Sequence, residues 1–256
     1  MSEKRIVILA GKWETTPIVY NYLKNDFIIQ RVVIEEGVSK KDFLKKRINK
    51  LGWLTVLGQV CFQVFISKPM GKASRKRMDE ISRQYNLSHA PIAENLVSEV
   101  SSVNANETIQ LLNGLAPDLV IVHGTRIIAR KVLQAVSCPF VNVHAGITPR
   151  YRGSHGAYWA LANNDKDHCG VTVHLVDAGI DTGNILSQKN ITITQKDNFT
   201  TYPLLQLAEG LRLLKEVIPQ LLAGTANLTN NNLNSALWHH PTLWSYLIKR
   251  LRDGVK

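Results

Sequence analysis

Short runs of β-branched and other apolar residues alternate with helical patterns along this chain, and this alternation constrains the fold more than any other feature. Arg5–Ala10 and Leu119–Val122 are strand-sized runs, each followed by a loop. Phe140–His144 and Gly170–Val176 are two more, with a helical pattern at about 155–163 between them. Strands that alternate with helices pack as a mostly parallel sheet with helices on both faces. We therefore predict an α/β fold with a doubly wound, mostly parallel sheet.

The last quarter of the chain has a different pattern. A long amphipathic helix is expected at about 202–222, followed by a polar turn and an aromatic, basic tail. A length of 256 residues fits one large domain or one domain with an appendage. We expect residues 1–200 to form the main domain, with a basic helical segment at 40–77 within it. Residues 201–256 are then a short C-terminal extension, made of a helix and an aromatic tail.

Positive charge is concentrated in one part of the sequence. The chain has 31 Lys and Arg against 20 Asp and Glu, a net charge of +11. Between Lys40 and Arg77, 11 residues are basic and one, Asp42, is acidic, so nearly all of the excess lies there. Such a segment favours anionic partners, such as nucleic acid, phosphorylated small molecules or an anionic membrane. A solvated helix face explains the same charge run equally well.

The longest apolar stretch lies within this basic segment. It runs from Leu51 to Ile66, 16 residues interrupted by Gln59 and Gln63, which is short for a helix that spans a bilayer. We interpret it as a buried helix. The alternative is an interfacial helix flanked by Lys50 and Lys68.

The cysteines and the N-terminus indicate a cytoplasmic location. Cys61, Cys138 and Cys169 are far apart in the sequence, a pattern that predicts neither a disulfide framework nor a zinc cluster. The apolar run after Arg5 is about five residues long, too short for a secretory signal. We expect a cytoplasmic protein without a metal, and the basic segment adds peripheral contact with the inner face of the membrane as an open alternative.

Two polar side chains stand at the end of one predicted strand. Asn142 and His144 are two residues apart, so both side chains leave the same face of the strand. In sheets of this kind, ligands bind in the crevice beyond the carboxyl ends of the strands. An amide and an imidazole there can donate hydrogen bonds to a developing oxyanion, and the imidazole can also move a proton. A lone histidine on a strand is nevertheless more often structural than catalytic.

A loop with two acids and two glycines follows the Gly170–Val176 run. Its acids are Asp177 and Asp181. A carboxylate close to His144 would orient the imidazole and stabilise its protonated form. Turns of the Asp-x-Gly kind are also ordinary loop chemistry, so the loop by itself does not establish a catalytic role.

Together these motifs are more specific than any one of them. Asn142-x-His144, then Pro149-x-Tyr-Arg-Gly, then Asp181-Thr-Gly some 37 residues after His144 resemble the catalytic domain of the N10-formyltetrahydrofolate-dependent formyltransferases. The likeness is greatest to the nucleotide-sugar N-formyltransferases, and the superfamily also contains glycinamide ribonucleotide transformylase and methionyl-tRNA formyltransferase. It covers residues 105–190 well and the opening strand and helix loosely.

The resemblance implies a Rossmann-like formyltransferase fold, with residues 1–200 as the catalytic domain, and it assigns two sets of residues. The catalytic set is Asn142, His144 and Asp181. The residues expected to bind the folate are Arg126, Ile127, Ile128, Val176, Asp177 and Gly179. We place the catalytic acid at Asp181 because its Asp-Thr-Gly context matches the family better than the context of Asp177 does.

The sequence departs from the family in two places. Many members have His-x-Ser-Leu-Leu-Pro where this chain has His144-Ala-Gly-Ile-Thr-Pro149, so Gly146 replaces a serine. The positioning of the donor or the acceptor near that loop is therefore open. The opening loop, 11–15, lacks the Gly/Ser-rich phosphate cradle of the purine enzyme, which disfavours glycinamide ribonucleotide as the acceptor.

The resemblance implies an enzyme that transfers a formyl group from N10-formyltetrahydrofolate to the primary amine of a nucleotide-linked deoxyamino sugar, as in lipopolysaccharide biosynthesis. The amine attacks directly, through a tetrahedral intermediate and without a metal. The small number of residues after the long helix disfavours tRNA as the acceptor, although the positive charge favours it. A formyltetrahydrofolate hydrolase and a membrane-surface partner in polysaccharide synthesis are further alternatives. The sequence leaves open the sugar, the role of 40–77 and a homodimer.

Overall fold

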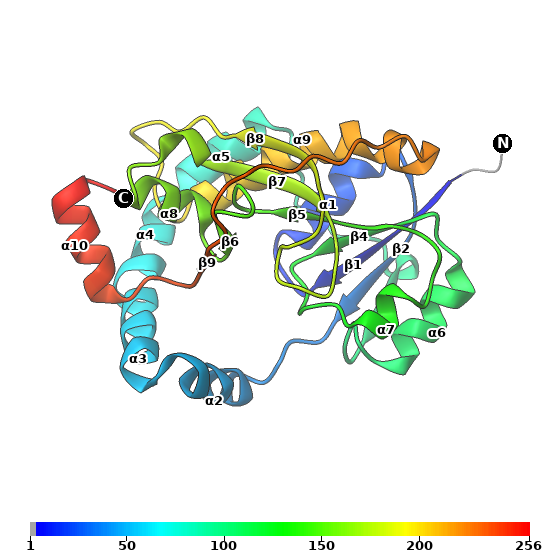
Figure 1. Ribbon diagram of the computed structural model, residues 1–256, viewed down its shortest axis with the longest axis horizontal. Helices are drawn as coiled ribbons and strands as arrows, with labels where there is room; N and C mark the ends of the chain where they lie inside the picture. Colours follow the sequence, from blue (N-terminus) through cyan, green and yellow to red (C-terminus); the bar gives the residue numbers. More distant parts are fainter. Residues whose placement is uncertain (1–3) are drawn as a thin grey trace.

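The computed structural model describes residues 4–256 and is built around one central sheet (Figure 1). The strands of this sheet are β1 (Arg5–Gly11), β2 (Ile28–Glu35), β3 (Val97–Val100), β4 (Leu119–His123), β5 (Phe140–His144), β7 (Gly170–Leu175) and β8 (Ile185–Asn190). Their order is β3-β2-β1-β4-β5-β7-β8. The pairs from β3 to β5 are parallel, and β7 runs antiparallel to β5 and β8. The predicted mostly parallel α/β fold is confirmed.

Helices cover both faces of the sheet (Figure 1). They are α1 (Thr16–Leu23), α6 (Asn106–Leu115), α7 (Arg130–Leu133), α8 (Gly156–Ala162) and α9 (Tyr202–Ala223). Successive side chains of a strand point to opposite faces, so Ile6 and Ile8 pack in the core beneath α1 and α9. Val7 and Leu9 pack on the other face, in the core with α6 and α7. The apolar part of β1, from Ile6 to Ala10, is therefore buried on both sides, whereas Arg5 at its start is exposed.

The helix α9 packs against β5, β7 and β8 and contributes to the same core as β1. A small second sheet pairs β6 (Arg152–Gly153) with β9 (Leu237–Trp238), and so ties the polypeptide after α9 to the loop after β5. The domain boundary at residue 200 stays a prediction. Within residues 4–256, the structure has no helix that is both long enough and apolar enough to cross a membrane.

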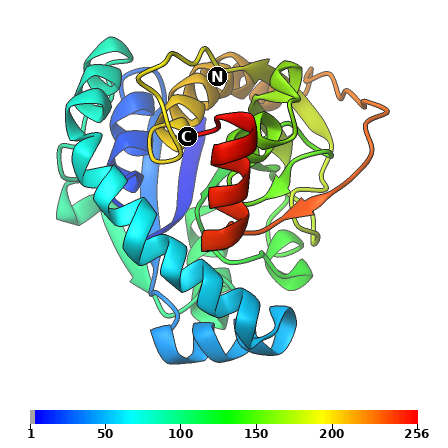
Figure 2. The same cartoon turned by 90° about the vertical axis from the view of Figure 1, so that its left-hand side faces the viewer.

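Residues 40–84 form a series of helices that we call the helical arm. Its parts are α2 (Lys40–Leu51), α3 (Trp53–Phe62), the π-helix η1 (Gln63–Ser67), α4 (Lys68–Ala73) and α5 (Arg75–Gln84). The arm runs diagonally across one side of the molecule, with α10 (Leu243–Asp253) beside α3 (Figure 2). Ser39 caps the start of α2, where its side chain accepts a hydrogen bond from the backbone N–H of Asp42. Gly52, at φ +82, separates α2 from α3.

The expectation that 51–66 is a buried helix is wrong. Val56 and Phe62 are buried, but Trp53 and Phe65 are 67% and 65% exposed. The polar Gln59 lies on the inner side, where its amide donates to the His240 carbonyl and its Oε1 accepts from Arg47. The helix is therefore buried along one side only, and much of its apolar surface faces outward.

One buried ion pair fastens the arm to the sheet side of the molecule. Arg77 on α5 donates two hydrogen bonds to Asp197 in the loop before α9, at 2.8 and 3.0 Å. The Asp197 carboxylate has no exposed surface. Burial alone would raise the pKa of Asp197, but hydrogen bonds from Arg77 and Thr194 outweigh it and hold the pKa below its ordinary value. Asp197 is therefore ionised and fully paired.

We predict that Asp197→Asn lowers the free energy of unfolding by about 3 kcal/mol, because the largely buried guanidinium of Arg77 loses its fully buried carboxylate partner and keeps only the 3.4 Å contact with Glu80. Urea denaturation at neutral pH measures the loss. Asp167→Asn is the control, since Asp167 is exposed and its side chain makes none of these contacts. In the wild type, the depressed pKa means that this stabilisation is present above the ordinary pKa of about 3.9 and is lost on further acidification. Equal stability of the two variants would contradict the prediction.

Candidate active site

The polar residues of the predicted site meet where β5 ends beside β7. The antiparallel register pairs Asn142 with His174 and His144 with Thr172. A cavity of about 340 Å³ opens at this point, and we call it the His144 cavity. Every residue that the sequence proposed for the site lines it, namely Asn142, His144, Asp181, Arg126, Ile127, Ile128, Val176, Asp177 and Gly179. The structure thus brings the two predicted sets together, while their catalytic and binding roles remain predictions.

His144 is held between two hydrogen-bond acceptors. Its Nδ1 lies 3.3 Å from Oδ2 of Asp181, and its Nε2 lies 2.8 Å from the carbonyl oxygen of Tyr151. A carbonyl oxygen accepts hydrogen bonds and cannot donate them, so the Nε2 of His144 carries the hydrogen in its bond to Tyr151. The other ring nitrogen faces the Asp181 carboxylate. These two contacts hold His144, which is 5% exposed, in one orientation.

Asp181 is itself fixed by the loop after β5. Its Oδ2 accepts a hydrogen bond of 2.9 Å from the backbone N–H of Gly153. Its backbone is in the left-handed region, with φ +52, an uncommon conformation for a residue other than glycine. Uncommon backbone conformations of this kind persist where the surrounding contacts require them. The contacts to Gly153 and His144 fix this carboxylate in position.

Asp177, the other acid of the loop, has a different set of contacts. One of its oxygens accepts from the backbone N–H of Gly179 at 3.0 Å, and both lie 2.8 Å from the Thr182 hydroxyl. These bonds close the loop on itself. The structure therefore places Asp181, and not Asp177, against His144.

His174 is a further site residue, which the sequence did not reveal. Its Nδ1 lies 2.7 Å from the Leu175 carbonyl and must donate to it, which leaves Nε2 free to accept. The Asn142 amide nitrogen lies 3.2 Å from that Nε2 and donates to it. Burial lowers the pKa of His174 below its ordinary value, so the ring is neutral near pH 7. A neutral His174 thus fixes which end of the Asn142 amide is the donor.

The loop after β4, at 124–128, is held by a buried carboxylate. The carboxylate of Glu35, at the end of β2, accepts a hydrogen bond of 2.7 Å from the backbone N–H of Arg126. Its other oxygen lies 2.8 Å from the Nε of the Arg126 side chain. Ile127 is 52% exposed beside the cavity, whereas Ile128 is 2% exposed and packs in the core. Of the two isoleucines, Ile127 is thus the one free to contact a ligand. No local pattern indicates a role for Glu35, because Arg126, to which it bonds, is 91 residues further along the chain.

Gly146 is required by the contact between His144 and Tyr151. A Cβ atom at this position would lie 2.2 Å from the Tyr151 carbonyl oxygen and 2.8 Å from Nε2 of His144. No side chain fits there while that hydrogen bond exists. The replacement of the serine common in the family by Gly146 is therefore matched to the local arrangement of His144.

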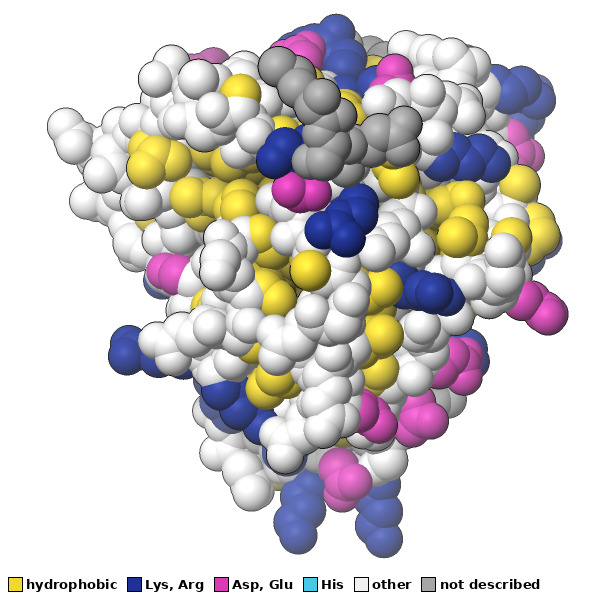
Figure 3. Space-filling model, turned by 90° about the vertical axis from the view of Figure 1, so that its right-hand side faces the viewer, with side chains coloured by type: hydrophobic (Ala, Val, Ile, Leu, Met, Phe, Trp, Pro, Cys, Tyr) yellow, Lys and Arg dark blue, Asp and Glu magenta, His cyan; other side chains and the backbone are white. Residues whose placement is uncertain are grey.

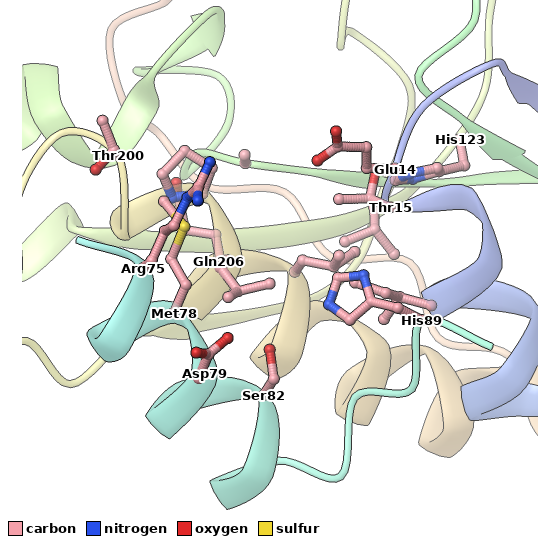
Figure 4. A pocket seen from close by; sticks show the side chains of 16 residues that line it. Glu14, Thr15, Arg75, Met78, Asp79, Ser82, His89, His123, Thr200 and Gln206 are labelled. Carbon is pink, nitrogen blue, oxygen red and sulfur yellow. Dashed lines mark hydrogen bonds between the residues drawn. The ribbon is translucent and has the colours of Figure 1, made fainter. Parts of the chain in front are cut away.

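A second cavity, of about 460 Å³, lies on the other side of the end of β5, and we call it the α5 cavity (Figure 4). Val143 and Ala145 line both cavities. Arg75, Met78 and Asp79 on α5 form one wall, and Glu14, Thr15 and His123 lie across from them (Figure 4). The His123 ring nitrogen lies 2.8 Å from the Thr15 hydroxyl, and burial lowers the pKa of His123 to about 4. This histidine is therefore neutral at physiological pH.

The fold and these two cavities define an α/β protein with a polar site at the switch between parallel and antiparallel strands. Residues 39–218 match the family model described as "Formyl transferase", so the chain belongs to the formyl transferase family. The methionyl-tRNA formyltransferase of Kosmotoga olearia is 30% identical over 175 residues, which are 67% of this chain and 53% of that protein. The corresponding protein of Nitratiruptor sp. is 36% identical over 134 residues, 52% of this chain and 42% of that one. The chain thus spans about half the length of these curated relatives.

Solved structures agree on the fold. A sugar N-formyltransferase from Shewanella sp. superposes with a TM-score of 0.56 and 16% identity, covering 91% of this chain and 76% of that one. The phosphoribosylglycinamide formyltransferase of Streptococcus pneumoniae gives a TM-score of 0.53 and 19% identity, covering 86% and 98%. These similarities confirm the Rossmann-like formyltransferase fold expected from the sequence.

We predict that His174 stays neutral, with its hydrogen on Nδ1, down to a pH below the ordinary histidine value of about 6.5. As the pH falls through that value, the unfolded chain takes up a proton that the folded site does not. His174 therefore removes up to about 1.4 kcal/mol of stability per pH unit there. Nitrogen-15 NMR of the imidazoles, with the His174→Gln variant to assign the signal, measures the titration and the tautomer. A His174 signal that titrates at or above 6.5 contradicts the predicted environment.

Proposed function

We propose that this protein transfers a formyl group from N10-formyltetrahydrofolate to the primary amine of a nucleotide-linked deoxyamino sugar. One observation carries the proposal: His144, paired with Asp181 and next but one to Asn142, stands at a strand end with a cavity on each side. Membership of the formyl transferase family supports the reaction and the folate donor. Two adjoining cavities suit a reaction that joins two substrates.

The folate donor is proposed to bind in the His144 cavity. A pterin is flat and carries hydrogen-bond donors and acceptors along its edge, so it needs fixed backbone groups together with apolar contact. The loop at 124–128 offers both, because Glu35 holds its backbone and Ile127 is exposed beside the cavity. The loop closed by Asp177 lines the same cavity from another side. In this proposal, the formyl group of the bound folate lies near the end of β5.

The acceptor is proposed to bind in the α5 cavity. Because Val143 and Ala145 line both cavities, an amine bound there reaches the formyl carbon at the end of β5. The volume of the cavity is in the range of small-molecule sites. One wall carries the cation Arg75, which can pair with a phosphate. The same wall carries Asp79 and Ser82, which can form hydrogen bonds with sugar hydroxyls. These features favour a small phosphorylated amino sugar.

The catalytic step derives from the hydrogen-bond arrangement of the site. The unprotonated amine attacks the formyl carbon, and the carbonyl oxygen becomes an oxyanion. The Asn142 amide, with one N–H bound to His174, has a second N–H for this oxyanion, and protonated His144 stabilises the same charge. Asp181 orients His144 while the amine proton passes to the leaving folate nitrogen. The C–N bond to the amine forms and the C–N bond to folate N10 breaks.

Methionyl-tRNA is a second candidate acceptor. The curated relatives favour it, since those with 30% to 36% identity carry that name. The net charge of +11 also fits a nucleic acid. The α5 cavity, whose volume of about 460 Å³ suits a small molecule, favours the sugar.

We predict that Asp181→Asn lowers kcat about 10²-fold or more, because the amide removes the negative charge that faces His144. Asp177→Asn alters the proposed folate-binding loop without touching His144, so it should raise the folate KM and change kcat much less. Formyl transfer, followed by mass spectrometry of the product, measures both. The reverse ranking would show that the wrong carboxylate is assigned.

The acceptor is tested with a panel. We expect the protein and N10-formyltetrahydrofolate to add 28 Da, the mass of CO, to a nucleotide amino sugar. Methionyl-tRNA and glycinamide ribonucleotide are incubated in parallel. Formylation of charged tRNA alone would reject the sugar assignment and keep the family reaction. Release of formate without any formylated amine would instead indicate a hydrolase.

A further inference from the structure

Exposed hydrophobic side chains are concentrated on the helical arm and α10. Most of the large hydrophobic residues that are exposed anywhere in 4–256 belong to these helices. They are Phe43, Leu44 and Ile48 on α2; Trp53, Leu54, Leu57, Val60, Val64 and Phe65 on α3 and η1; and Trp244, Leu247, Ile248 and Leu251 on α10. We call this set the outer apolar face. A contiguous exposed apolar surface of this kind marks an interaction site.

The spacing of these residues shows that each helix presents a stripe. Trp53, Leu57, Val60 and Val64 recur every three or four residues, and so do Trp244, Leu247, Ile248 and Leu251 on α10. Residues with this spacing lie along one side of a helix. Opposite each stripe, the same helices bury Phe62 and Tyr246 against the body of the protein. The stripes therefore point outward because the opposite sides of the helices are packed against the protein, and not because the helices are frayed.

The two stripes form one fixed surface. The helix α10 packs beside α3 (Figure 2). A Cβ atom on Gly58 would lie 2.3 Å from the Trp244 indole, so Gly58 leaves the space in which that ring rests. Gln59 of α3 also donates to the His240 carbonyl, three residues before α10 begins. A partner that contacts one stripe can therefore contact the other.

Positive charge accompanies the outer apolar face. Residues 40–77 hold nearly all of the net positive charge of the chain. Lys45, Lys46 and Lys50 alternate with the exposed apolar residues of α2, and Arg250 and Arg252 flank Leu251 on α10. A different side of the molecule, shown in Figure 3, has acidic and basic side chains interspersed among small hydrophobic groups. The combination of aromatic and aliphatic stripes with Lys and Arg is typical of helices that lie in a membrane interface.

We propose that the outer apolar face docks on the surface of an anionic phospholipid bilayer. The apolar stripes enter the boundary between headgroups and acyl chains, and the Lys and Arg side chains contact the lipid phosphates. A second copy of this chain fits less well, because it would bring two strongly basic segments together. A nucleic acid fits less well too, because its interfaces are polar and would leave the tryptophans and leucines exposed. This inference does not depend on the formyl transfer proposed above.

The experiment measures binding of the full chain to vesicles of phosphatidylcholine with or without phosphatidylglycerol. We expect sedimentation with the anionic vesicles, weakened by salt, and little sedimentation with the neutral ones. Lys45→Glu with Lys46→Glu should lower binding more than tenfold, since each basic residue near such a surface contributes strongly. Lys24→Glu with Lys131→Glu is the matched control, with the same change in charge outside the arm. Circular dichroism verifies that both variants are folded.

A second arm of the experiment locates the contact by tryptophan fluorescence. Phospholipids with brominated acyl chains quench only tryptophans that enter the bilayer. We expect quenching that falls in Trp53→Phe and is largely lost when Trp244→Phe is added, because both tryptophans belong to the outer apolar face. Quenching should be retained in Trp13→Phe, because Trp13 is similarly exposed, at 59% against 67%, but lies in the loop after β1. Trp53→Glu should also reduce sedimentation, whereas Leu228→Glu, at an exposed leucine outside the face, should not.

Three results would overturn the proposal. Absence of binding to anionic vesicles at low salt is the first. The second is a dimer, detected by analytical ultracentrifugation, that Trp53→Glu dissociates while vesicle binding is unaffected. The third is binding of tRNA that competes with vesicles and is lost in Lys45→Glu with Lys46→Glu but kept in Trp53→Glu, which would assign the face to a nucleic acid.

Discussion

The placement of His144 between Asp181 and the Tyr151 carbonyl is the interaction on which the site depends. Both acceptors come from loops, and each loop is fixed by other contacts. The Tyr151 hydroxyl donates to Asp165 at 2.8 Å, and Arg150 and His168 contact the same carboxylate. Burial, together with the bond to Asp165, raises the pKa of Tyr151 to about 12, so this hydroxyl remains a donor. The Tyr151 carbonyl and the Asp181 carboxylate that contact His144 are thus each held in place by other bonds.

The antiparallel strand β7 makes this arrangement possible. In an all-parallel sheet, the neighbour of β5 would end at the same edge, and a helix would follow it. Because β7 runs the other way, His174 lies opposite Asn142 and the β7–β8 connection, which carries Asp177 and Asp181, returns to the end of β5. The carboxylate, the imidazole and the amide therefore meet through one strand pairing. The two cavities flank the same pairing, and Val143 is among the residues that line both.

Local patterns were enough to predict the parts of the fold and site that depend on local chemistry. The apolar runs around Leu119 and Phe140 are strands, and Asn142 and His144 share a face, as alternation requires. Asp181 was chosen over Asp177 by family resemblance, and its contact with His144 agrees with that choice. His174, Glu35 and Asp197 were not found, because each acts on a partner distant in sequence. Only strand order and register bring those partners together, and single-sequence patterns do not determine either.

The side of a helix that is buried is a tertiary property of the same kind. The apolar stretch at 51–66 has hydrophobic residues all around the helix, so its sequence does not show which side is buried. The inner side is the one that carries Gln59, because the Gln59 amide donates a hydrogen bond to the His240 carbonyl. Two residues before His240, in β9, the Trp238 carbonyl accepts a hydrogen bond from the backbone N–H of Ser154. The residue before Ser154 is Gly153, whose backbone N–H bonds the Asp181 carboxylate. At its other end, the arm continues into α5, a wall of the α5 cavity. The outer apolar face and the Asp181 carboxylate are therefore connected through one series of hydrogen bonds, and the arm that carries this face also forms a wall of the α5 cavity.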